Sequence, residues 1–145
     1  MIFSLYNLFI DKANLLQSAV LLVVRLWIAH VFFASGLVKI ADFDTTIALF
    51  RDEYAVPVLP PVLAAVMATI FELSCPVLLT LGAATRLATL PLIGMTAVIQ
   101  LTYDQNIQHA YWAMLLFTLL AFGAGKWSID SIIKRQAKGG RYATA

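Results

Sequence analysis

Two ionisable side chains lie inside apolar stretches of this sequence, where a charge is costly. Arg25 belongs to AVLLVVRLWIAHVFFASGLVK (residues 19–39), and Glu72 belongs to the apolar stretch of residues 58–81. On membrane-insertion scales a charged side chain at a helix centre costs about 2.5–3.5 kcal/mol, so such residues are candidates for function. An arginine could hold an anion or a quinone carbonyl, and a carboxyl group could move protons. These two residues are therefore the first candidates for a catalytic or cofactor-binding site.

The expected depths of the two side chains favour a direct ion pair. Measured from Ala19 and Leu81 at about 1.5 Å per residue, Arg25 and Glu72 would lie roughly 9 Å and 14 Å from the same membrane boundary. An arginine side chain is long enough to cover the difference. We therefore predict a buried Arg25–Glu72 pair, and removing one partner should cost about 3–5 kcal/mol. The pair could equally be structural, fixing the register of two neighbouring helices.

Other residues are further candidates for the same chemistry. Lys39 recurs at helical spacing with Arg25 and Gly36, so it could contribute to ligand binding from the same stripe. His30 lies about 140° around the helix from Arg25 and could carry a proton, although such a histidine is more often a structural hydrogen-bonding residue. No metal site is predicted, because the soft ligands show no recognised spacing. These ligands are His30, His109, Cys75, Met67, Met95 and Met114.

Composition identifies the kind of element that must position these residues. The 145 residues are 61% hydrophobic and 12% charged, with a mean hydropathy of +0.86. Soluble domains are about 45–50% apolar and about 25% charged. The apolar runs are continuous and rich in Leu and Ala, whereas strands of a membrane barrel alternate over about 10 residues. We therefore predict an all-α integral membrane protein.

The helical spans are predicted at about 19–39, 58–81, 87–102 and 110–125, forming a four-helix bundle within one membrane domain, 1–145. The last two are near the lower length limit of ~17 residues, so three crossings are the alternative. An interfacial helix is predicted within residues 1–18, with a frayed extension as the alternative. A second is predicted at residues 45–54, capped by Asp44. A basic tail occupies residues 126–145.

The placement of lysine and arginine predicts the orientation of these spans. With both termini on one side, that side holds most of the basic residues, namely Lys12, Arg86, Lys126, Lys134, Arg135, Lys138 and Arg141. The opposite side holds only Lys39 and Arg51, so both termini are predicted to be cytoplasmic. The formal net charge of +2 gives no indication of nucleic-acid binding. Cys75 is the single cysteine, which disfavours a self-contained thiol–disulfide exchange.

Three segments together resemble the DoxX family of small four-helix membrane proteins. They are VVRLWIAHVFFASGLVKI with Arg25, Gly36 and Lys39, FELSCPVLLTLGAATRLA with Glu72, Gly82 and Arg86, and the closing FGAGKWSID. The resemblance covers about residues 21–133 and implies a multi-pass protein of the bacterial inner (plasma) membrane linked to respiratory or redox functions. Some members are described as quinol-oxidase subunits. The LPP and HAYW segments are most similar to the branch that accompanies DUF692-type enzymes in gene clusters for metal-responsive modified peptides.

Two functional hypotheses follow. The first is an accessory subunit in a redox or quinone-linked process, in which Arg25 and Glu72 line a cavity; whether it is itself an enzyme stays open. The alternative is a non-catalytic membrane partner or scaffold in a copper-related modified-peptide system. The expected partners are the lipid bilayer and other membrane or periplasmic proteins, and the chain could form homo-oligomers. No cofactor is specified by a motif, and a quinone is the one we consider.

Overall fold

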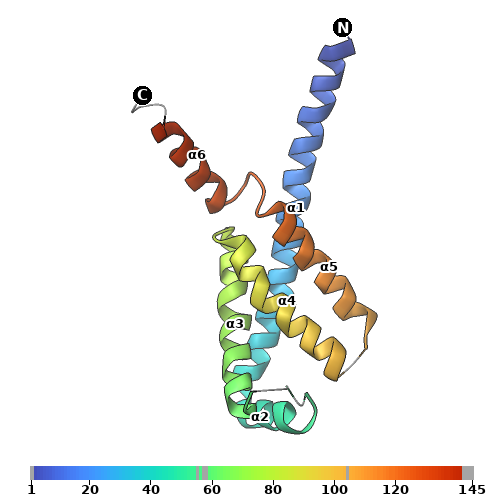
Figure 1. Cartoon of the computed structure of the whole chain (residues 1–145), viewed down its shortest axis with the longest axis vertical. Coiled ribbons are helices and arrows are strands. Elements are labelled where there is room, and N and C mark those ends of the chain that lie inside the picture. The colour runs from blue at the N-terminus through green and yellow to red at the C-terminus, as the bar shows by residue number, and fades with distance from the viewer. Residues whose placement is uncertain (1, 55, 57–58, 104, 142–145) are drawn as a thin grey trace.

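The computed structural model describes residues 2–54, 56, 59–103 and 105–141, and in this part of the chain all regular secondary structure is helical, without strands. The prediction of an all-α protein is therefore confirmed. The helices, shown in Figure 1, are α1 (Ile2–Ala41), α2 (Phe43–Asp52), α3 (Pro61–Leu81), α4 (Thr85–Thr102), α5 (Ile107–Phe122) and α6 (Ile129–Arg141).

Four helices contact one another in a ring: α1 packs on α3, α3 on α4, α4 on α5, and α5 on α1. Their shared core contains fully buried aliphatic side chains from each of them, including Ile28, Leu79, Leu92, Leu116 and Leu119. Helix α2 packs across the start of α3. A second apolar cluster lies there, formed by Phe50 with Ala64, Ala65 and Ala68.

Proline and glycine mark the ends of α3. Pro61 occupies its first position, where a missing N–H costs no hydrogen bond. Gly82 ends it in the left-handed conformation, with φ +66°. Glycine is the residue most often found in this conformation directly after a helix. The following helix, α4, begins only three residues later at Thr85, so α3 and α4 form a tight antiparallel pair.

The helix in the first loop is present, but its cap differs from the prediction. Helix α2 begins at Phe43, and its N-cap is Asp42 rather than Asp44. Asp42 accepts the Thr45 N–H at 3.0 Å and the Thr45 hydroxyl at 2.7 Å. These hydrogen bonds, the hydroxyl first, lower the pKa of Asp42. Asp44 instead lies inside the first turn, where its charge suits the positive end of the helix.

Helix α1 is continuous from Ile2 to Ala41, so the prediction of a separate N-terminal interfacial helix is wrong. The segment contains no proline, and its only glycine is Gly36, so nothing in it interrupts the helical hydrogen bonds. Asp11 and Lys12 are accommodated within the helix. In Figure 1 the first part of α1 projects beyond α3, α4 and α5, at the end of the molecule where α6 also lies.

Two helical segments are long and apolar enough to cross a membrane, Lys12–Ala41 and Pro61–Leu81. Helix α5 is apolar but has only 16 residues. Large apolar side chains are exposed along these helices, including Val23, Trp27, Ile70 and Phe117. Four crossings therefore stay a prediction. The beginning of α1 and the end of α6 lie at the same end of the molecule, and which side of a membrane that end faces is likewise a prediction.

Candidate functional site

Arg25 is buried at the end of the helical ring, beside the connection from α5 to α6. Only 2% of the residue is exposed. Its Nη1 donates to the carbonyl oxygen of Ala124 at 2.7 Å, and its Nη2 donates to that of Trp127 at 3.0 Å. The carboxylate of Asp130 attracts the same guanidinium from a greater distance. Arg25 thus ties α1 to backbone that follows α5.

Glu72 is buried about half-way along α3 and pairs with Lys39 near the end of α1. The Lys39 Nζ lies 2.6 Å from the Glu72 Oε2 and also donates to the Ser35 Oγ at 2.8 Å. Only 3% of the Glu72 side chain and 13% of the Lys39 side chain are exposed. Gly36 faces this pair, and a Cβ built there would lie 3.1 Å from the Glu72 Cβ. The missing side chain allows α1 and α3 to approach closely.

The predicted Arg25–Glu72 ion pair is therefore wrong, because the register of α1 and α3 separates the two groups. Gly36 faces Glu72, whereas Gly82 faces Arg25, since a Cβ at Gly82 would lie 2.5 Å from the Arg25 Nη1. Glu72 and Gly82 are about ten residues apart on α3, or about 15 Å at 1.5 Å per residue. The sequence-based depths assumed that Ala19 and Leu81 lie at one height, but α1 extends well past the end of α3.

Asp130, in the first turn of α6, holds the end of the ring together. Its backbone N–H donates to the Gly82 carbonyl oxygen at 2.9 Å. Its two carboxylate oxygens accept the N–H groups of Ala84 at 2.8 Å and Thr85 at 3.0 Å, which caps α4. Sequence reasoning gave Asp130 no role, because a cap supplied from 46 positions away has no local pattern.

Replacing Gly82 with alanine is expected to lower the free energy of unfolding by about 2–4 kcal/mol. Alanine is strained at positive φ, and the new Cβ would overlap the Arg25 guanidinium and the Ser128 Cβ. Thermal unfolding of the purified protein in detergent would measure the change. Gly94→Ala is the matched control, because no atom lies within 4 Å of the added methyl group. Equal unfolding temperatures for the two variants would contradict the close approach of Arg25 to Gly82.

A largely apolar cavity of about 210 Å³ lies next to the Lys39–Glu72 pair. It is bounded by α1, α2, α3, α4 and the segment between α2 and α3. Its apolar walls include Phe50, Met67, Ala68, Phe71, Pro91, Met95, Val98 and Ile99. Lys39, Glu72 and Tyr54 are the ionisable residues among its lining. The cavity therefore combines apolar walls with a charged pair on one side.

Tyr54, which sequence reasoning missed, supplies a phenol group to this cavity. Its ring packs edge-on against Phe50 and Tyr103, with centroids 5.0 Å and 4.9 Å away. Burial raises the pKa of the Tyr54 phenol, and nearby acidic groups, Tyr103 first among them, raise it further. The phenol consequently stays protonated at neutral pH and can donate a hydrogen bond. The segment after α2 gave no motif that could have indicated this role.

His30 lies apart from both buried groups. Its side chain is exposed and lines a shallow groove of about 290 Å³ between α1 and α3, together with Pro76 and Thr80. It contributes neither to the cavity at Lys39–Glu72 nor to the hydrogen bonds of Arg25. The structure thus brings together Lys39 and Glu72 among the predicted site residues, and it separates them from Arg25 and His30.

Long apolar helices and exposed apolar side chains point to an α-helical membrane protein. A family model for DoxX matches residues 20–105, which include α2, α3, α4 and the second half of α1. The chain belongs to the DoxX family. Comparison with curated proteins and with solved structures found no match. Arg25, Lys39 and Glu72 lie within the matched residues, whereas Ala124, Trp127 and Asp130 lie beyond them.

Proposed function

We propose that this DoxX-family membrane protein is an accessory redox subunit that binds a quinone head group in the cavity beside Lys39 and Glu72. The observation that carries the proposal is the buried ion pair in the wall of an otherwise apolar cavity. Ligand sites combine mostly apolar walls with a few convergent polar groups, as here. A volume of about 210 Å³ is below the usual range of ~300–1,000 Å³, so it suits a single ring rather than a whole isoprenoid molecule.

The residues of the cavity fit the chemistry of a quinone. Lys39 and Tyr54 are hydrogen-bond donors, as ring carbonyl oxygens require. Glu72 can accept a proton from Lys39 or release one, so the pair can hold the protons that quinone reduction consumes. When bound, the quinone would supply two-electron redox chemistry, with electrons coming from a partner subunit in the membrane. We assign Arg25 a structural role, because its Nη1 and Nη2 donate to backbone carbonyls.

The same proposal places the chain in the bacterial inner membrane as a four-pass protein with cytoplasmic termini. The ring of contacts formed by α1, α3, α4 and α5 supports four crossings. The common location of the beginning of α1 and the end of α6 supports termini on one side. Basic residues gather at that end, in agreement with the rule that positive charge favours the cytoplasmic side.

Binding of a short-chain quinone to the purified protein in detergent tests the proposed function. We expect Tyr54→Phe and Lys39→Met each to weaken binding about tenfold, because each removes one buried hydrogen bond to the quinone, worth roughly 1.4 kcal/mol. Quenching of tryptophan fluorescence would measure the affinity. His30→Ala is the control on the same pair of helices and should bind as the wild type does. Absence of binding by the wild type, or wild-type affinity in both cavity variants, would reject the proposal.

A further inference from the structure

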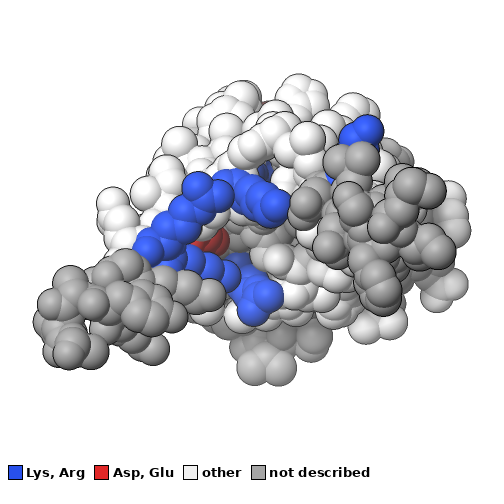
Figure 2. Space-filling view, turned by 90° about the horizontal axis from the view of Figure 1, so that it is seen from above, with Lys and Arg blue, Asp and Glu red and all other residues white. Residues whose placement is uncertain are grey.

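A second, larger cavity of about 580 Å³ opens at the end of the molecule where α6 lies. It lies between the first half of α1, the beginning of α4, the α5–α6 connection and α6. Figure 2, viewed onto this end, shows lysine and arginine side chains around a hollow. This cavity is separate from the one at Lys39–Glu72, since the two share no lining residue.

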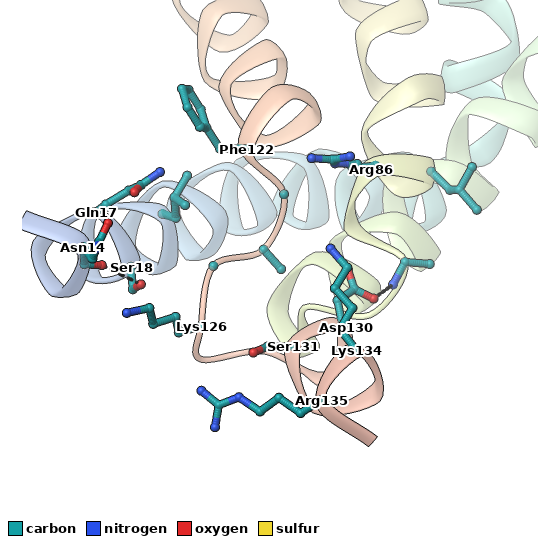
Figure 3. Close-up of a pocket in the computed structure, with 16 residues that line it drawn as sticks. Asn14, Gln17, Ser18, Arg86, Phe122, Lys126, Asp130, Ser131, Lys134 and Arg135 are labelled. Carbon is teal, nitrogen blue, oxygen red and sulfur yellow. Dashed lines mark hydrogen bonds between the residues drawn. The ribbon is translucent and has the colours of Figure 1, made fainter. Parts of the chain in front are cut away.

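The second cavity is strongly cationic. Arg86, Lys126, Lys134 and Arg135 line it, and Asp130 is the only acidic residue among the lining residues that the structure describes. The Asp130 carboxylate is engaged by backbone N–H groups at the start of α4, as the dashed bond in Figure 3 illustrates. It forms no ion pair with these four residues within the described part of the chain. Among the described residues, four cations against one carboxylate therefore leave an excess of positive charge in the cavity.

Most hydrogen-bond donors of these four basic residues are also available to a ligand. Lys126, Lys134 and Arg135 make no hydrogen bond or ion pair with the residues that the structure describes. Arg86 donates one Nη2 bond to the Ala121 carbonyl oxygen at 2.8 Å, which orients its guanidinium beside the cavity. The amides of Asn14 and Gln17 line the cavity from α1 (Figure 3). Cations and amides from four different segments thus surround one space.

We propose that this cavity binds a phosphate group. Arginine presents a planar fork that matches phosphate oxygens, and lysine adds a compact charge. Basic pockets beside membrane helices, at the level of the lipid head groups, bind the phosphates of anionic lipids. The ligand chemistry is a phosphate ester, carried by a phospholipid head group or by a small soluble molecule. The proposal does not depend on the quinone site.

Native mass spectrometry of the protein in a neutral detergent would test this site. The probes are cardiolipin, phosphatidylcholine, glycerol 3-phosphate and inorganic phosphate. We expect cardiolipin to bind at least tenfold more tightly than phosphatidylcholine, and this binding to weaken with added salt. Competition by glycerol 3-phosphate or inorganic phosphate would identify a soluble phosphate as a ligand; cardiolipin binding without competition would identify a lipid head group.

Variants distinguish the cavity from general surface charge. The double variant Lys134→Gln, Arg135→Gln and the single variant Arg86→Gln are each expected to lose at least tenfold in affinity for the phosphate probe that the wild type binds. Arg51→Gln removes an exposed cation from α2, outside the cavity, and should have no effect. Absence of binding by every phosphate probe would overturn the proposal, as would wild-type affinity in Arg86→Gln.

Discussion

Replacing Glu72 with alanine is expected to lower the free energy of unfolding by about 3–5 kcal/mol. The Lys39 ammonium would keep its buried position but lose the carboxylate 2.6 Å away, and an unpaired buried charge is strongly destabilising. Reversible unfolding in mixed detergent micelles, followed by circular dichroism, would measure the loss. Asp52→Ala is the control, because it removes an exposed carboxylate from α2. Equal stability of these two variants would contradict a buried ion pair.

A double replacement, Lys39→Met with Glu72→Leu, is expected to recover most of that stability. Apolar side chains of similar volume often substitute for a buried ion pair without a net loss. The double variant should nevertheless bind the quinone at least tenfold more weakly, because both charged groups of the cavity wall are gone while Tyr54 remains. This result would separate the contribution of the pair to stability from its contribution to binding. A double variant as unstable as Glu72→Ala would show that the loss has another origin.

Replacing Arg25 with alanine is expected to cost a similar amount, about 3–5 kcal/mol. Each hydrogen bond from a charged donor contributes about 1.5–3 kcal/mol, and removing the donor leaves an acceptor unsatisfied. The acceptors are the carbonyl oxygens of Ala124 and Trp127, in the connection that leads into α6. Arg25→Lys should restore only part of the stability, because an ammonium lacks the fork that reaches both oxygens.

The loss of stability in Arg25→Ala should also appear locally, in the connection that leads into α6. Because α6 follows this connection directly, limited trypsin digestion should cut near Lys126 faster in Arg25→Ala than in the wild type. Arg51→Ala, which removes an exposed arginine from α2, is the matched control. Unchanged digestion and unchanged unfolding in Arg25→Ala would contradict the role assigned to the two hydrogen bonds.

Features set by local sequence could be predicted. The continuous apolar runs predicted the helices, and the predicted ends at Leu81 and Thr102 are those of α3 and α4. Gly82 and Pro61 mark boundaries because their backbone preferences act within one or two residues. The first loop was predicted to contain a helix, but two aspartates, Asp42 and Asp44, both satisfied the pattern for its cap. Only the hydrogen bonds to Thr45 distinguish them.

The pairing of the buried charges could not be predicted, because it depends on how far α1 slides along α3. Arg25 donates to two backbone carbonyls. A carbonyl oxygen is present at every residue, so this contact leaves no signal in the sequence. Lys39 was recognised as a candidate ligand residue but not as the partner of Glu72. The expected depths pair Glu72 with Arg25 instead. The sequence thus indicates most residues of the site, but it does not indicate which of them are in contact.

The distance along the chain between Arg25 and its acceptors bears on how the protein is made. Ala124 and Trp127 follow Arg25 by 99 and 102 positions. At a synthesis rate of about 5–20 residues per second, roughly 5–20 s pass before the ribosome has added them. During that interval the first helix carries its guanidinium without the oxygens that later hold it. A nascent chain released before residue 124 would therefore leave the translocation machinery with an Arg25 guanidinium that lacks its hydrogen-bond acceptors. Quality-control proteases could recognise such a chain.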